Sequence, residues 1–145
     1  MADRLQLDII TPERGVLSEA VDAVTLPGLG GELGILPGHT PLISQLQTGV
    51  LSYTQGATTR RLHVSGGFVE VSEDRVAVLA ELAERPEEID AARARAERDQ
   101  AEKLLGSTTG SEDDLSHART QFERSVARLE IAGDSVPHTP DPRSL

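Results

Sequence analysis

Apolar and polar residues alternate along most of the first 84 residues of the chain. Residues 5–9 (LQLDI) show this period of two, and it recurs at 62–64, 68–71 and 76–82. Such alternation indicates half-buried β-strands. Pro and Gly interrupt the pattern every ~8–12 residues, a spacing typical of a β-sandwich or barrel. This part of the chain is therefore predicted to form about eight to ten short strands.

The pattern changes at Pro86, which suits the first turn of a helix because a proline there loses no hydrogen bond. Residues 87–105 are rich in Ala, Arg and Glu, which are good helix formers, and predict a first helix. The sequence GSTTG at 106–110 predicts a break, Ser111 a helix N-cap and Gly133 a C-cap. The second helix is expected to bury a narrow apolar stripe: Leu115, Ala118, Phe122, Val126 and Leu129.

The two patterns together predict an α+β chain. Residues 1–85 are expected to form the β-sandwich, residues 86–133 an antiparallel two-helix hairpin, and the Pro-rich residues 134–145 a disordered tail. The apolar stripe of the hairpin is thin and rich in alanine. Because hydrophobic stabilisation scales with buried apolar area, we expect the hairpin to dock weakly and to move. A stably docked hairpin is the alternative.

Composition excludes several classes of protein. The 145-residue chain has a formal net charge of −10, one Tyr, two Phe and no Trp, which argues against nucleic-acid binding. It has no Cys, so disulfides and thiolate metal sites are excluded. No apolar run approaches the ~20 residues that span a bilayer, and the N-terminus lacks a signal-peptide core. We therefore expect no direct membrane insertion, and any membrane association to be through a partner.

A glycine-rich stretch, GGELGILPGHTPL at 30–42, is the most unusual segment of the chain. It does not match a dinucleotide fingerprint or a P-loop, because the third glycine is out of place, no helix follows, and Gly-Lys-Ser/Thr is missing. The four histidines share no metal-ligand spacing, and no nucleophile with a nearby base can be named. No catalytic residue and no metal ligand is therefore predicted. The stretch is interpreted as a turn-rich docking surface with one carboxylate, Glu32, at its tip.

The segments GELGILPGHTPL (31–42), Gly49-Val50-Leu51 and Gly66-Gly67-Phe68-Val69-Glu70-Val71 together resemble the epsilon subunit of bacterial rotary (F-type) ATP synthases. The resemblance extends over nearly the whole chain. It implies a sandwich of about ten strands with a C-terminal hairpin, and a non-catalytic subunit of the central rotor. It also implies binding to the gamma subunit and to the ring of c subunits, with Glu32 near the ring and His39 near gamma.

The same resemblance implies a place for the protein in the cell. The family works at the cytoplasmic side of the bacterial inner (plasma) membrane, as a peripheral part of the complex. A plastid origin is the alternative, and the long tail and Arg-rich composition favour a bacterium. The resemblance implies that the protein requires no cofactor and that ATP binds to it only as a regulatory ligand.

ATP sensing is implied by a family motif, I/L-D-x-x-R-A, at the start of the first helix. Ile89, Asp90, Arg93 and Ala94 fit every fixed position of the motif. The family's two arginines in the second helix and its carboxylate before the hairpin correspond to Arg124, Arg128 and Glu84. Two arginines at i,i+4 share a helix face, so both can reach one phosphate chain.

Two observations weaken the prediction of an ATP site. A further family arginine in the first helix falls on Gln100, which removes one possible phosphate contact. The alternative for the hairpin arginines is that they are solvated or paired with carboxylates, of which the candidates are Glu97, Glu123 and Glu130.

The family mechanism implied here is a two-state switch that ATP biases by binding only the compact form. In the extended form the hairpin enters the alpha/beta catalytic head and blocks hydrolysis, with Arg119, Arg124 and Arg128 meeting acidic residues there. One alternative is a coupling subunit whose hairpin does not inhibit. The other is an unrelated β-sandwich enzyme or small-molecule binder, for which the sequence offers no nucleophile or metal cluster.

Overall fold

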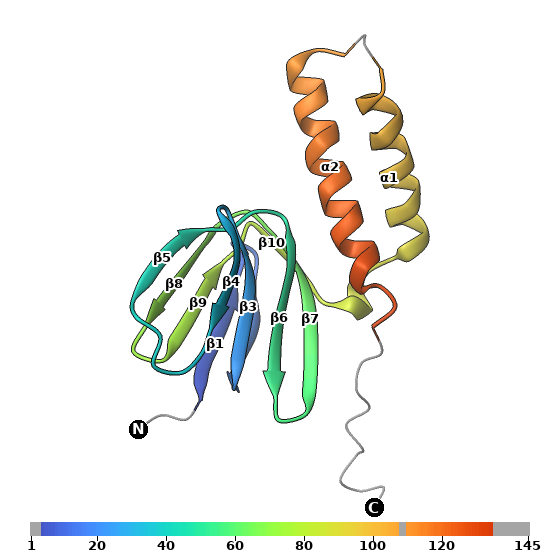
Figure 1. The fold of residues 1–145 in the computed structure, drawn as a ribbon. Coiled ribbons are helices and arrows are strands. Elements are labelled where there is room, and N and C mark those ends of the chain that lie inside the picture. Colours follow the sequence, from blue (N-terminus) through green and yellow to red (C-terminus); the bar gives the residue numbers. More distant parts are fainter. Residues whose placement is uncertain (1–3, 108–109, 135–145) are drawn as a thin grey trace, which may run out of the picture.

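The computed structural model describes residues 4–107 and 110–134, and in this part of the chain ten strands precede two helices (Figure 1). The predicted tail lies outside the described residues except for Asp134. The strands are β1 Leu5–Ile10, β2 Gly15–Val21, β3 Ala23–Gly28, β4 Gly31–Ile35, β5 Leu42–Gln45, β6 Gly49–Gln55, β7 Thr58–Ser65, β8 Phe68–Ser72, β9 Arg75–Leu79 and β10 Leu82–Glu84. A short 3₁₀ turn, η1 Pro86–Glu88, leads to the helices α1 Ala91–Leu105 and α2 Glu112–Ile131.

The strands form two five-stranded sheets that pack face to face. The first has the order β2-β1-β9-β8-β5 and the second β10-β7-β6-β3-β4. All pairs are antiparallel except β1 and β9, which run parallel. The predicted β-sandwich of about ten strands is confirmed.

The alternation in the sequence maps onto the two faces of each sheet. In β1, Leu5, Leu7 and Ile9 are buried between the sheets, whereas the intervening residues are partly exposed. The buried apolar core is built from strand residues and their connections, and no helical residue belongs to it. The sandwich therefore has a complete hydrophobic core of its own.

The turn between β7 and β8 requires glycine. Gly66 and Gly67 have φ angles of +68° and +96°, which L side chains rarely adopt. A Cβ atom on Gly67 would lie 1.9 Å from the carbonyl oxygen of Leu79. This turn carries the chain from one sheet to the other and brings Gly67 against the backbone of Leu79.

The first helix begins later than predicted. Pro86 opens only the 3₁₀ turn, and Ile89 is extended, so α1 starts after an N-cap at Asp90, whose Oδ1 accepts a 3.1 Å hydrogen bond from the Arg93 amide. The Ser111 cap of α2 is confirmed, with its Oγ accepting a 3.1 Å bond from the Asp114 amide. The helices pack against each other as an antiparallel hairpin (Figure 1).

The predicted apolar stripe of α2 is partly wrong. Ala118 is buried, but Val126 is 42% exposed, and Leu115, Phe122 and Leu129 are only partly buried. The buried residues of α2 are Ala118, Ser125, Ala127 and Ile131. Small side chains hold the two helices close together, so the larger apolar residues beside them lie at the margin of the contact.

The end of α2 is also one residue from its predicted place. The C-cap is Ala132, and Gly133 follows it without a positive φ angle.

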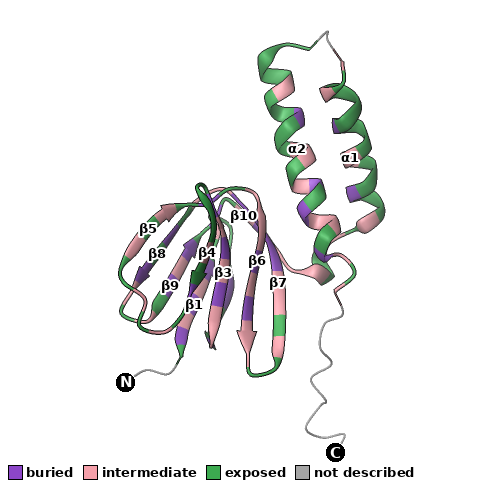
Figure 2. Cartoon of the chain, in the orientation of Figure 1, coloured by how far each residue is buried: buried purple, intermediate pink, exposed green. Residues whose placement is uncertain are grey.

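The hairpin contacts one edge of the sandwich. It projects from the side where β7 and β10 lie, and α2 contacts β6 and β7 (Figure 1). Buried residues are frequent along the strands but sparse on the helices, whose surface is mostly exposed (Figure 2). Within the described residues, no helix is long and apolar enough to cross a bilayer.

Candidate ligand-binding site at the base of the hairpin

Glu84, the last residue of β10, connects the sandwich to the hairpin. Its Oε1 accepts a 2.8 Å hydrogen bond from Nδ1 of His63, which is fully buried on the neighbouring strand β7. The same oxygen accepts a 2.6 Å bond from Nε of Arg128 on α2. One carboxylate therefore joins three elements that are distant in sequence.

The surroundings of Glu84 favour its charged form. Burial raises its pKa, but the hydrogen bonds from His63 and Arg128, together with their charges, outweigh burial and lower the pKa from 4.5 to about 2. Glu84 is therefore a carboxylate at neutral pH, and its charge faces that of Arg128. This contact is an ion pair that the hairpin must break to leave the sandwich.

Glu97 on α1 occupies the centre of the arginine cluster. Its Oε1 accepts a 2.8 Å bond from Nε of Arg93, and its Oε2 lies 3.4 Å from a terminal nitrogen of Arg128. The guanidiniums of Arg93 and Arg128, both predicted to bind ATP, are thus bridged by a carboxylate. The predicted alternative, pairing of the arginines with Glu97, holds for Arg93 and Arg128.

A cavity of about 210 Å³ lies beside this cluster. It brings together six of the seven residues predicted to bind ATP. Its lining comprises Glu84, Glu88, Ile89, Asp90, Arg93, Ala94, Glu97 and Arg128. Four carboxylates against two guanidiniums give these residues a formal charge of −2. A polyphosphate could use both guanidiniums only if Glu97 turned away from them.

Arg124, the seventh predicted residue, does not line this cavity. Its Nε donates a 2.9 Å hydrogen bond to Oγ of Ser65, which lies 2.8 Å from Oγ1 of Thr48. Arg124 therefore makes a second polar link between α2 and the sandwich, one turn from Arg128. No carboxylate pairs with it among the described residues.

The residues predicted to meet partner subunits lie apart from the cluster. Glu32 is exposed in β4, opposite Pro27, and so belongs to a strand next to the β3–β4 turn, not to the tip of a loop. His39 follows β4, and its Nδ1 lies 2.6 Å from the Thr40 carbonyl oxygen. Arg119 is exposed on α2. These three side chains take no part in the cavity.

One residue of the site, His63, was not identified from the sequence. His63 occupies a polar position in the strand alternation, so it was expected to face solvent, but α2 covers that face of β7. Glu97 was identified only as one of three candidate partners of the hairpin arginines, because its contact with α2 depends on the packing of the helices. No group of side chains in the described part of the chain is arranged to hold a metal ion.

Comparison with known proteins gives consistent matches over both parts of the chain. Residues 4–86 match the family model described as "ATP synthase, Delta/Epsilon chain, beta-sandwich domain". Residues 87–133 match the model described as "ATP synthase, Delta/Epsilon chain, long alpha-helix domain".

Curated relatives match over nearly their full length. The chain is 44% identical to ATP synthase epsilon chain 2 of Syntrophotalea carbinolica, with 92% of this chain and 96% of that protein covered. It is 46% identical to the ATP synthase epsilon chain of Syntrophobacter fumaroxidans, with coverage of 91% and 98%.

Solved structures with a similar fold come from ATP synthases. A chain in the Euglena gracilis mitochondrial ATP synthase, OSCP/F1/c-ring, has a TM-score of 0.79 at 25% identity, with 91% of this chain and 82% of that chain covered. A chain in the central stalk/c-ring structure from Tetrahymena thermophila has a TM-score of 0.59 at 16% identity, with coverage of 88% and 96%, and supports the fold alone.

Proposed function

Because the chain belongs to the ATP synthase delta/epsilon chain family, we propose that it is a non-catalytic subunit of the central rotor of a bacterial F-type ATP synthase. In this role it couples proton translocation to ATP synthesis and, through its hairpin, inhibits ATP hydrolysis. Its partners are the gamma subunit, the c-ring and, when the hairpin extends, the alpha/beta head. It is peripheral at the cytoplasmic side of the inner membrane.

The outer face of the sheet β2-β1-β9-β8-β5 supports a docking role. Ile10, Leu79 and Phe68 are neighbours across β1, β9 and β8, and all three are about half exposed. Ile43 on β5 is 73% exposed on the same sheet. Contiguous exposed apolar side chains commonly mark a protein–protein interface. We assign this face to gamma, together with His39, and the end of the sandwich at Glu32 to the c-ring.

The observation that carries the inhibitory role is the way the hairpin meets the sandwich. The apolar core contains no hairpin residue, and the links between them are polar: Arg128 with Glu84, Arg124 with Ser65, and Arg61 with Asp134. An element held by a few polar contacts can leave without exposing an apolar core. In the extended state Arg119, Arg124 and Arg128 are freed to meet acidic residues of the head.

ATP is proposed to hold the compact state. Glu84, Ile89, Asp90, Arg93, Ala94 and Arg128 line one cavity between the sandwich and the docked hairpin, whereas Arg124 lies outside it, bonded to Ser65, and must leave Ser65 to reach the same phosphate chain. A ligand that binds only the docked form shifts the balance towards it. The phosphates must displace Glu97 from Arg93 and Arg128, which predicts weak binding.

The test is ATP hydrolysis by the matching catalytic complex depleted of this subunit. The full chain and residues 1–85 are titrated separately, since the sandwich holds its own core. Inhibition by the full chain alone supports the proposal, and a variant with Arg119, Arg124 and Arg128 changed to Ala should then lose it. If the complex hydrolyses ATP equally fast with the full chain and with residues 1–85, and both bind gamma, the protein is a coupling subunit whose hairpin does not inhibit.

A further inference from the structure

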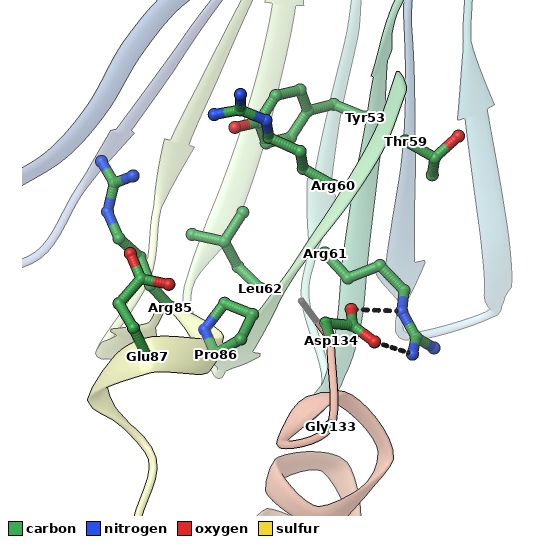
Figure 3. Close-up of a pocket in the computed structure, with 10 residues that line it drawn as sticks. All are labelled: Tyr53, Thr59, Arg60, Arg61, Leu62, Arg85, Pro86, Glu87, Gly133 and Asp134. Carbon is green, nitrogen blue, oxygen red and sulfur yellow. Dashed lines mark hydrogen bonds and ion pairs between the residues drawn. The ribbon is translucent and has the colours of Figure 1, made fainter. Parts of the chain in front are cut away.

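A second cavity, of about 420 Å³, lies on another side of the junction between the domains (Figure 3). β10 pairs with β7 only at residues 63–65, so residues 58–62 of β7 have no partner strand on that side. The cavity occupies this open edge, between β7, η1 and the residues that follow α2. Its lining comprises Tyr53, Thr59, Arg60, Arg61, Leu62, Arg85, Pro86, Glu87, Gly133 and Asp134.

Three arginines surround this cavity, although the chain as a whole is acidic. The side chains of Arg60, Arg85 and Arg61 lie on three sides of Leu62 (Figure 3). Arg61 is neutralised by Asp134, to which its Nε and a terminal nitrogen donate bonds of 2.9 and 2.6 Å. Glu87 also lines the cavity, so its three arginines and two carboxylates give a formal charge of +1. The positive charge of the cavity therefore depends on the other two arginines.

Neither Arg60 nor Arg85 is paired with a carboxylate within the described part of the chain. Arg85 donates to the carbonyl oxygen of Val16. The Nε atom of Arg60 is buried and has no hydrogen-bond partner. Buried donors without a partner are rare in folded proteins, and such a donor beside a cavity indicates a missing acceptor.

Tyr53 adds an apolar wall and a further donor. It is the cross-strand partner of Arg60, and its ring lies beside the Arg60 guanidinium (Figure 3). Burial, helped by the charge of Glu19, raises the pKa of its phenol, although the charges of Arg60 and Arg85 and a hydrogen bond with Arg60 act in the opposite direction. Tyr53 and Leu62 are each only 2% exposed, so together with Pro86 they give the cavity a narrow apolar surface beside the two guanidiniums that no described carboxylate pairs.

We propose that this cavity binds a small organic phosphate. Arg60 and Arg85 bind the phosphate, for which guanidinium forks are suited, and Tyr53, Leu62 and Pro86 contact an apolar or planar body. The volume falls within the range of small-molecule sites, about 300–1,000 Å³, and exceeds what a bare phosphate would fill. Because Gly133 and Asp134 form one wall, the ligand also contacts the end of the hairpin.

The site is distinct from the cluster at Glu84. The two cavities share no lining residue, and the basic residues of the Glu84 cavity are Arg93 and Arg128. The proposal therefore does not depend on ATP sensing by the hairpin.

The experiment titrates the full-length chain with phenyl phosphate, AMP and inorganic phosphate in separate calorimetric runs at constant ionic strength. We expect both organic phosphates to bind at least tenfold more tightly than inorganic phosphate. The tighter of the two identifies a nucleotide or a smaller aromatic phosphate as the better match. Equal binding of all three would remove the role of the apolar wall and overturn the proposal.

Variants locate the binding. Arg60→Gln and Arg85→Gln are each expected to weaken phenyl phosphate binding tenfold or more. Arg95→Gln, an exposed change on α1, is the matched control and should leave it unchanged. Binding that survives both test changes, or is lost equally with Arg95→Gln, would contradict the assignment.

A second change at Arg60 separates a loss of binding from a loss of folding. Arg60→Lys keeps the positive charge and much of the stem that lies beside Tyr53, but it lacks the Nε donor. It is expected to fold, as judged by its thermal unfolding midpoint, and to bind phenyl phosphate with intermediate affinity. Affinity equal to that of the unaltered chain would show that the buried Nε has no part in binding and would overturn its role.

Discussion

Nε of Arg128 lies 2.6 Å from Oε1 of Glu84, and this ion pair joins the second helix of the hairpin to the last strand of the sandwich. Both side chains are about four-fifths buried. The pair thus differs from surface ion pairs, whose contribution to stability is small. Removing one partner leaves the other charge partly buried without compensation.

Arg128→Ala is expected to loosen the docked hairpin. A hydrogen bond to a charged partner contributes about 1.5–3 kcal/mol, so the amides of α2 nearest the sandwich should exchange with deuterium at least about tenfold faster. Hydrogen–deuterium exchange followed by mass spectrometry measures this directly. Arg119→Ala, an exposed change on the same helix, is the control. Equal protection in both variants would mean that the pair does not hold the hairpin.

Glu97→Gln is expected to strengthen ATP binding, if the cluster binds ATP as proposed. The change removes a negative charge from the cavity and weakens the hold on Arg93 and Arg128, so the affinity should rise about three- to tenfold. Calorimetric titration of the full chain measures the change. Glu102→Gln, exposed on the same helix, should have no effect. Weaker binding by Glu97→Gln would indicate that Glu97 organises the arginines instead of competing for them.

The Glu84 carboxylate makes stability depend on pH. Its pKa is about 2 in the folded protein and 4.5 ordinarily, so its contribution is complete above about pH 4.5 and is lost as the pH falls towards 2. Urea unfolding at several pH values should show that the unaltered chain is more stable than Glu84→Gln near neutrality, with the difference shrinking below pH 4.5. Glu32→Gln, an exposed change on β4, is the control. A difference that is constant from pH 7 to 2 would refute the prediction.

Gly67→Ala is expected to destabilise the sandwich by about 3 kcal/mol or more. The new Cβ would overlap the carbonyl oxygen of Leu79, and a φ of +96° is strained for any L side chain. Gly15→Ala is the matched control, because nothing lies within 4 Å of its Cβ position, and it should change stability by no more than about 0.5 kcal/mol. Thermal or urea unfolding of both variants provides the measurement.

The strands could be predicted because the alternation of apolar and polar residues shows directly which side chains face the core. Leu5, Leu7 and Ile9 face the core as the alternation requires. The start of α1 was harder to predict, because a proline such as Pro86 fits the beginning of a 3₁₀ turn as well as the first turn of an α-helix. The side chain of Asp90, which caps α1, determines the true beginning.

The site was predictable only in part, since spacing along the chain does not define contacts between elements. Ile89, Asp90, Arg93 and Ala94 of the sequence motif all line one cavity, and their role in binding stays a prediction. The motif could not show that Glu97 reaches across to the second helix, because that contact depends on the alanine-lined approach of α1 to α2. The burial of His63 likewise follows from the hairpin covering a strand face that the alternation marks as polar.

The polar character of the hairpin–sandwich junction makes the docking of the hairpin sensitive to salt. Contacts between charged groups weaken as dissolved ions screen them, with a Debye length of about 8 Å at physiological ionic strength, whereas the apolar core between the sheets is not weakened in this way. Arg61 and Asp134 are about one-third exposed, so dissolved ions reach this part of the junction. Concentrated salt is therefore expected to weaken the Arg61–Asp134 link and loosen this end of the docked hairpin, while the core between the sheets stays intact. Under the proposed inhibitory role, ionic strength would then shift the hairpin towards its extended state.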